Sequence, residues 1–320
     1  GLGVFLDVVY NHIGPGSEAV GAFGPYFTDR HETFWGAAID YSQRGVREWA
    51  IQNAEQWIRD YRLDGLRLDA THAVYDDSSE HVLAELARRV KALNPRALIT
   101  SEIEPEDFRP LDEWGHDAQW ADRSHHELHV LLTGEREGYY RRFGSVHELA
   151  NDLAGRGRQP EKLIVCAQNH DQVGNRAAGD RLPPDALRVA AACTLFSPCT
   201  PLLFMGEEYA EPNPFQFFTD HIDPFIADAT REGRRREFEA FSSFSGEEVP
   251  DPQAEETFLR SKLSRQEDAE HRALYERLLR LRHELPRELE THVEGNRLTM
   301  RRGRAELVAD FDAKTVDLRA

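Results

Sequence analysis

The amino-acid sequence predicts an α/β fold: a (β/α)8 TIM barrel that lacks its first two strands and is followed by the start of a C-terminal β domain. Two observations lead to this prediction. Short apolar segments alternate with amphipathic helical segments along most of the chain, which is typical of a parallel sheet covered by helices. Polar residues also gather at the C-terminal ends of these apolar segments, where barrels of this kind carry their chemistry.

The apolar segments predict six strands, near residues 3–9, 65–70, 97–103, 117–121, 162–169 and 201–206. In GLRLDA, the second of them, Leu66 and Leu68 alternate with Arg67 and Asp69, so the leucines face one side and the charges the other. Because a closed barrel has eight strands and the chain opens directly on a strand, we expect two strands to precede Gly1. We assign residues 1–285 to the partial barrel and 286–320 to the β domain.

The segments between the strands predict the helices. In the segment 44–62, apolar residues recur at helical spacing, and the turn signal Asp64-Gly65 follows them. Further helices are predicted at 79–93, 145–154, 185–196, 230–241 and 267–285. The Gly- and aromatic-rich segment 10–41 is predicted to be an irregular loop, the arginines at 234–236 to face solvent, and 297–302 and 305–320 to be strands.

Composition narrows the class of partner. A formal net charge of −18 argues against nucleic acid and against an anionic membrane surface, because both bind positively charged proteins. No apolar run approaches the roughly 20 residues that cross a bilayer. The three cysteines, Cys166, Cys193 and Cys199, have no zinc-like spacing, so we expect them to be reduced and buried in a cytoplasmic protein. We expect no cofactor and no metal site.

Three acids end separate predicted strands: Asp69, Glu102 and Asp171. Two carboxylates that face one bond can divide the work, since one attacks carbon while the other donates a proton to the leaving oxygen. Arg67 lies on the same face as Asp69 and favours its ionised form, which makes Asp69 the nucleophile and Glu102 the acid. His12 and His170 would then donate hydrogen bonds to substrate hydroxyls.

Each of these residues also has a purely structural interpretation. Arg67 and Asp69 form an internal ion pair in many barrels, and Glu104 competes with Glu102 for the role of acid. A lone histidine such as His12 is more often a hydrogen-bonded structural residue than a catalytic one, and Asp171 could cap the following helix. Their joint occurrence at successive strand ends favours the catalytic interpretation.

Four short segments resemble the four motifs of the α-amylase superfamily (glycoside hydrolase family 13), in the same order: DVVYNH, GLRLDATHA, ITSEIE and AQNHDQ. TPLLFMGEEY is similar to the family's strand-eight motif. The resemblance implies a retaining enzyme that acts on α-glucosidic bonds, with Asp69 as nucleophile, Glu102 as acid/base and Asp171 as the third acid, which stabilises the transition state. It places substrate contacts at Asp7, His12, Arg67 and His170.

Longer stretches resemble the trehalose-releasing hydrolases of this superfamily, among them FGPYFTDRHETFWGAAIDYS and FMGEEYAEPNPFQFFTDH. This closer resemblance implies an α-glucan oligosaccharide as partner and cleavage of the α-1,4 bond next to a terminal trehalose unit. Tyr26 and Trp35 are candidates to stack on its sugar rings, with loop packing as the alternative. A branching or debranching enzyme of the same superfamily and a non-catalytic carbohydrate-binding barrel remain open as other interpretations.

Overall fold

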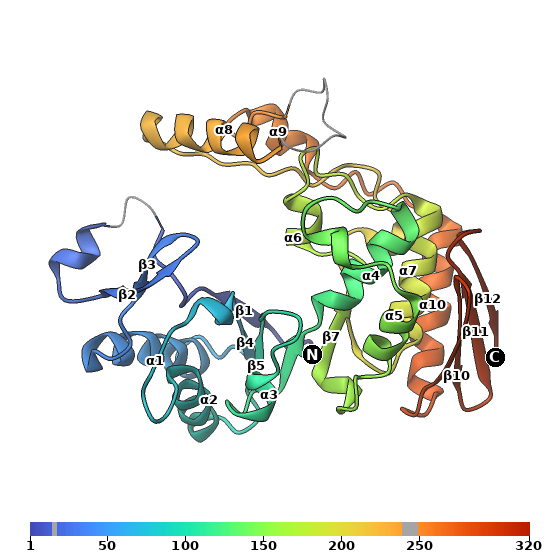
Figure 1. Ribbon diagram of the computed structural model, residues 1–320, viewed down its shortest axis with the longest axis horizontal. Helices are drawn as coiled ribbons and strands as arrows, with labels where there is room; N and C mark the ends of the chain where they lie inside the picture. Colours follow the sequence, from blue (N-terminus) through green and yellow to red (C-terminus); the bar gives the residue numbers. More distant parts are fainter. Residues whose placement is uncertain (15–17, 239–248) are drawn as a thin grey trace. The chain divides into compact units, whose positions relative to one another are not determined.

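The computed structural model describes residues 1–14, 18–238 and 249–320, and the chain divides into two compact units (Figure 1). The first unit comprises residues 1–121 and 162–164, and the second comprises residues 122–161 and 165–320. Each unit is built on part of a parallel sheet. All six predicted strands are present, and each is shorter than the sequence predicted.

In the first unit, four parallel strands lie in the order β1 (Phe5–Val8), β4 (Gly65–Leu68), β5 (Leu98–Ser101) and β6 (Ala118–Trp120). The first residues of β7 (Leu163–Cys166) pair with β6. Gly65 is required where β1, β4 and β5 run side by side, because a Cβ there would lie 2.4 Å from the Phe5 ring and 2.6 Å from the Leu98 carbonyl oxygen.

Two helices, α1 (Arg44–Arg59) and α2 (Val82–Leu93), pack with these strands in one apolar core. Leu66 and Leu68 of β4 are both fully buried in it, as their alternation predicted. Short helices complete the unit: single turns of 3-10 helix at Glu18–Ala22 and Thr71–Ala73, and α3 (Arg109–Asp112).

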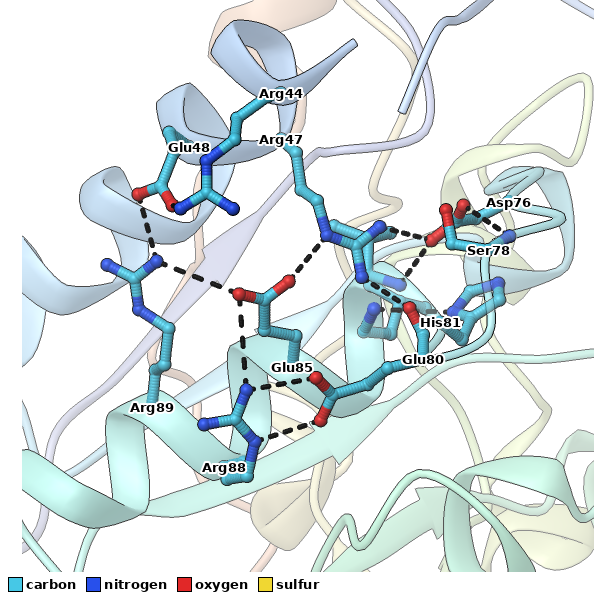
Figure 2. A network of polar contacts seen from close by, with 12 residues as sticks. Arg44, Arg47, Glu48, Asp76, Ser78, Glu80, His81, Glu85, Arg88 and Arg89 are labelled. Carbon is cyan, nitrogen blue, oxygen red and sulfur yellow. Dashed lines mark hydrogen bonds and ion pairs between the residues drawn. The ribbon is translucent and has the colours of Figure 1, made fainter. Parts of the chain in front are cut away.

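A network of charges joins α1 to α2 and to the loop before α2 (Figure 2). Arg47 of α1 binds the Asp76 carboxylate at 2.5 Å and Glu85 of α2 at 2.5 Å. Asp76 also accepts hydrogen bonds from the backbone N–H groups of Ser78 and Val82, at 3.0 and 2.6 Å. Its side chain is only 1 % exposed. The loop after β4 is therefore fixed to both helices by a buried carboxylate.

The prediction of an irregular loop over 10–41 is wrong for its second half. Residues 27–39 form an antiparallel hairpin of β2 (Phe27–Thr33) and β3 (Gly36–Ile39). Burial along β2 does not alternate, and charged residues occupy its exposed middle. A strand that buries neither face consistently has no period-two pattern by which the sequence would reveal it.

The second unit contains α4 (Asp122–Thr133), α5 (Val146–Leu153), α6 (His170–Gly174), α7 (Pro184–Phe196) and α10 (Ala269–Glu284), together with β8 (Thr200–Leu202) next to β7. Single turns of 3-10 helix lie at Gly138–Arg142, Pro160–Lys162 and Glu207–Tyr209. The sequence did not predict α4. Most of its residues are buried, His125, His126 and Glu127 among them, so it lacks the polar face that marks an amphipathic helix.

Two more helices of this unit, α8 (Pro224–Phe238) and α9 (Glu255–Arg260), follow β8 in the chain. Residues 239–241 of the helix predicted at 230–241 lie outside the described residues. The expectation that all three arginines at 234–236 face solvent is wrong for Arg234. Arg234 is 9 % exposed, and its guanidinium lies over the rings of Phe217 and Phe238, at 4.8 and 4.7 Å.

The chain ends in an antiparallel sheet of four strands, in the order β12 (Thr315–Arg319), β11 (Ala305–Asp310), β10 (Arg297–Arg302) and β9 (Glu290–Glu294). Leu298, Met300, Leu307 and Ala309 of this sheet are fully buried in a core shared with α7 and α10. Strand β9 was not predicted, and the domain boundary at residue 286 stays a prediction.

The three cysteines are buried and free of disulfides. Within the described parts of the chain, no helix combines the length and the hydropathy that a bilayer crossing requires.

Candidate active site

Three carboxylates of the first unit converge on the guanidinium of Arg67. Nη1 donates to Asp7 Oδ1 at 2.8 Å and to Asp69 Oδ1 at 2.6 Å, and Nη2 donates to Glu102 Oε2 at 2.7 Å. Asp7 and Arg67 are register partners on the parallel strands β1 and β4, so their side chains leave the same face of the sheet. Asp69 and Glu102 come directly after β4 and β5. Glu104, the competing acid, is exposed.

Glu102 is held by the turn that follows the neighbouring strand. The backbone N–H of Ala70 donates to Glu102 Oε2 at 3.0 Å, and Thr71 donates to the Glu102 carbonyl oxygen from its N–H at 2.9 Å and from Oγ1 at 2.6 Å. Ala70 has a left-handed backbone, with φ +39° and ψ +52°. That conformation is unfavourable for a residue with a Cβ, and such residues cluster at functional sites.

The environment of Arg67 keeps it charged and rigid. The side chain is 7 % exposed, and the Trp120 ring covers the guanidinium at 4.3 Å. Burial lowers the pKa of Arg67, but the negative charges of Glu102, Asp7 and Asp69 outweigh burial, so its pKa is raised. The carboxylates are more open, with Asp7 49 %, Asp69 22 % and Glu102 20 % exposed. A buried cation therefore lies behind acids that a ligand can reach.

Asn11 and His12 follow β1 and extend the cluster. Asn11 Nδ2 donates to the Asp69 carbonyl oxygen at 2.8 Å and to Asp69 Oδ2 at 3.0 Å, and Asn11 Oδ1 contacts His12 Nδ1. The imidazole of His12 stacks on the Trp35 ring, with centroids 4.4 Å apart and planes 9° from parallel. Burial lowers the pKa of His12, and the charge of Asp69 opposes that effect.

The two predicted aromatic residues differ in their surroundings. Trp35 lies at the turn of the β2–β3 hairpin, is 42 % exposed, and covers His12 beside the acids. Tyr26 packs edge-on against Trp49 of α1, with centroids 6.0 Å apart. The contact with α1 favours the packing interpretation for Tyr26, whereas Trp35 is exposed beside the acids.

The second unit carries the remaining predicted residues. His170 and Asp171 form the first turn of α6, immediately after β7, with His170 Nε2 3.3 Å from Asp171 Oδ2. Their side chains are 44 % and 39 % exposed. The capping interpretation proposed for Asp171 is wrong, because the side chain that caps α6 is that of Asn169, whose Oδ1 accepts from the Gln172 N–H at 2.7 Å.

The sequence did not single out Trp120 or Ala70. Trp120 ends β6, a strand that the sequence predicted only weakly, and a tryptophan at a strand end gives no hint that it covers an arginine two strands away. Ala70 is an ordinary alanine in the sequence, and only its backbone angles and its contact with Glu102 reveal its part in the site.

Comparison with known proteins gives the site its context. No protein-family profile matches the sequence. The malto-oligosyltrehalose trehalohydrolase of Deinococcus radiodurans is 44% identical over 323 residues, which cover 89% of this chain and 53% of that protein. The enzyme of the same name from Saccharolobus solfataricus is 38% identical over 319 residues, which cover 89% of this chain and 54% of that one. Over most of its own length, the chain is therefore similar to malto-oligosyltrehalose trehalohydrolases.

The chain spans about half of the length of the curated relatives it matches. Among solved structures, a provisionally named α-amylase from Salmonella typhimurium has a TM-score of 0.85 and 35% sequence identity, and the match covers 96% of this chain and 61% of that one. The chain thus has an α-amylase-like fold, in which part of a parallel barrel sheet precedes a C-terminal antiparallel sheet.

Proposed function

We propose that this chain carries the catalytic machinery for hydrolysis of the α-1,4 bond next to the terminal trehalose of maltooligosyltrehalose, with release of trehalose. The observation that supports it most strongly is the shared guanidinium: Arg67 binds Asp69 and Glu102 through adjacent nitrogens, at 2.6 and 2.7 Å. Two carboxylates held side by side in this way suit a double displacement with retention.

In the first step, a carboxylate oxygen of Asp69 attacks the anomeric carbon of the maltooligosaccharide while Glu102 gives its proton to the glycosidic oxygen. The carbon–oxygen bond breaks, trehalose departs with the proton, and the sugar remains as an ester of Asp69. In the second step, the Glu102 carboxylate takes a proton from water, the water oxygen attacks the same carbon, and the ester bond breaks.

Glu102 must carry a proton in the first step although it contacts a cation. Three ionised carboxylates around one guanidinium would leave a net charge of −2, so one proton in the cluster reduces the repulsion. Oε2 of Glu102 already accepts from Arg67 and from the Ala70 N–H. The acidic proton therefore belongs on Oε1, the oxygen that has to reach the leaving group.

The other predicted residues take supporting parts in the proposal. Asp171 is the third acid, which stabilises the transition state through the ring hydroxyls, with His170 beside it. Asp7 and His12 contact the sugar. Because Arg67 is buried behind the carboxylates, its part is to position them, and contact with the sugar falls to the more exposed groups. Trp35 offers a stacking surface.

Product identification tests the proposal. The full-length protein is incubated with maltooligosyltrehalose, and with a plain maltooligosaccharide of equal length as control. We expect free trehalose from the first substrate, and a loss of several orders of magnitude in turnover for Asp69→Asn and Glu102→Gln with the fold retained. Branched glucan as the product, or binding without hydrolysis, would support the branching-enzyme or carbohydrate-binding interpretation instead.

A further inference from the structure

Asn11 connects two groups of the candidate active site. The residue is 1 % exposed, and its side chain lies between Asp69 and His12. The contacts on its two sides differ chemically, and they settle which way the amide points.

On the Asp69 side, the amide must present its nitrogen. The backbone carbonyl oxygen of Asp69 can only accept a hydrogen bond, so the amide atom 2.8 Å from it is the donor Nδ2. The same Nδ2 reaches Asp69 Oδ2 at 3.0 Å, while Arg67 holds Oδ1 at 2.6 Å. Each carboxylate oxygen of Asp69 is therefore fixed by its own donor: Arg67 of β4 holds Oδ1, and Asn11, after β1, holds Oδ2.

On the other side, the amide oxygen faces His12 Nδ1. Because that oxygen only accepts, Nδ1 has to carry hydrogen. Burial, opposed by the charge of Asp69, lowers the pKa of His12 and favours the neutral ring. A neutral ring with hydrogen on Nδ1 has a lone pair on Nε2. The stack with Trp35 at 4.4 Å holds the plane of this ring.

We propose that Asn11 is a positioning residue that anchors the Asp69 carboxylate and fixes His12 as the Nδ1–H tautomer, so that His12 Nε2 accepts a hydrogen bond from a sugar hydroxyl. This reverses the direction predicted from the sequence, in which His12 donates. The inference rests on the proposed function where it names the sugar and the nucleophile. The tautomer itself follows from the contacts alone.

Nitrogen NMR of the full-length protein, labelled with 15N-histidine, tests the tautomer without any need for catalysis. The His12 signals are assigned by their loss in His12→Gln. At a pH where His12 is neutral, we expect a protonated Nδ1 and an unprotonated Nε2 in the wild type, and a shift toward the Nε2–H form in Asn11→Ala. An Nε2–H form in the wild type, or an unchanged tautomer in Asn11→Ala, would overturn the inference.

The matched control is Asn53→Ala. Asn53 lies in α1 of the same unit and accepts hydrogen bonds from Tyr10 and Trp57, at 2.8 and 3.0 Å. Its loss should lower stability and leave the His12 tautomer unchanged. If Asn53→Ala shifts the His12 tautomer equilibrium as far as Asn11→Ala does, then a general loss of stability explains the shift and the proposal for Asn11 is wrong.

A second variant examines the hold on Asp69. The charged and titratable groups around Asp69 are Arg67 of β4, Asp7 of β1, Glu102 directly after β5, and His12. Asn11→Asp adds a further acid beside Asp69 Oδ2, so the acidic limb of kcat/KM should move up by roughly one pH unit. A lower rate with an unmoved limb would contradict the anchoring role. Absence of trehalose release by the wild type would refute the proposed function, and the NMR result would stand independently.

Discussion

Arg67 donates a hydrogen bond of 2.7 Å to Glu102, in addition to the bond of 2.6 Å that it donates to Asp69. The proposed acid and the proposed nucleophile are thus held by one planar group, and their spacing depends on its shape. Lysine keeps the charge but offers a single nitrogen, which cannot reproduce the fork formed by Nη1 and Nη2 of the guanidinium.

We therefore expect Arg67→Lys to lower kcat by about 100-fold or more, because a misplacement of about 1 Å has that effect. The measurement is steady-state hydrolysis of maltooligosyltrehalose by the full-length protein. Arg30→Lys is the control, since Arg30 is 53 % exposed and pairs with Asp40. Turnover within a few-fold of the wild type in Arg67→Lys would show that the charge matters and the fork does not.

The left-handed backbone of Ala70 directs its N–H to Glu102. Glycine adopts this conformation freely, whereas a β-branched residue does so only with strain. We expect Ala70→Gly to keep kcat within about three-fold, and Ala70→Val to lower it by about ten-fold or more as the N–H turns away. Ala87→Val, at a buried position of α2, controls for the added volume. Equal losses of turnover in the two valine variants would remove the special role of Ala70.

Asp76 is the buried carboxylate of the network in Figure 2. Arg47 and the Val82 N–H share Oδ2 of Asp76, and the Ser78 N–H binds Oδ1. An asparagine would therefore set its NH2 donor either against Arg47 and Val82 or against Ser78, all of which are donors themselves. We expect Asp76→Asn to lower the free energy of unfolding by about 2 to 4 kcal/mol, measured by denaturant titration of the full-length protein. The control is Glu256→Gln, which breaks the ion pair of Glu256 with Arg260, whose side chains are 70 % and 60 % exposed. Its cost in unfolding free energy should be no more than about 0.5 kcal/mol. A similar small cost for Asp76→Asn would mean that solvent replaces its contacts.

The stability of the protein should depend on pH through His116, which lies in the first unit. Its Nε2 lies 3.2 Å from the Leu83 carbonyl oxygen, so Nε2 carries the hydrogen and Nδ1 accepts from Ser101 Oγ at 2.6 Å. Burial lowers the pKa of His116 from 6.5 to about 4. Because the unfolded chain then takes up the proton first, this group's contribution to stability is lost as pH falls from about 6.5 to about 4.

Replacing His116 by Gln should therefore flatten the decline of unfolding free energy over that pH range, by roughly 3 kcal/mol at most. Burial also lowers the pKa of His126 to about 4, so part of the slope should remain. His292→Gln, at an exposed position of β9, serves as the control. An unchanged slope in His116→Gln would show that the buried imidazole does not titrate with folding.

The parts of this molecule that were predictable from the sequence share a physical cause. Helices such as α1 bury one regular set of side chains, and strands such as β4 alternate apolar with charged side chains, so each displays its period in the sequence. Asp69 and Glu102 were found because each directly follows such a strand. Helix α4 and the β2–β3 hairpin were missed because neither has one buried and one exposed face.

Contacts between distant segments were beyond the reach of sequence patterns. That Arg67 binds Glu102 as well as Asp69, and that Trp120 covers it, depends on the order of the strands in the sheet. That Asn11 contacts both Asp69 and His12 depends on rotamers after β1. No spacing in the sequence encodes either of these arrangements.

Covalent trapping tests the central claim, that Asp69 attacks the sugar while Glu102 acts as acid, most directly. The full-length protein is treated with a fluorinated maltosyl fluoride whose ester intermediate hydrolyses slowly, and its peptides are analysed by mass spectrometry. We expect one fluoromaltosyl adduct, on the peptide that contains Asp69, and no adduct in Asp69→Asn. An adduct on another carboxylate, or turnover with inversion and no adduct, would contradict it.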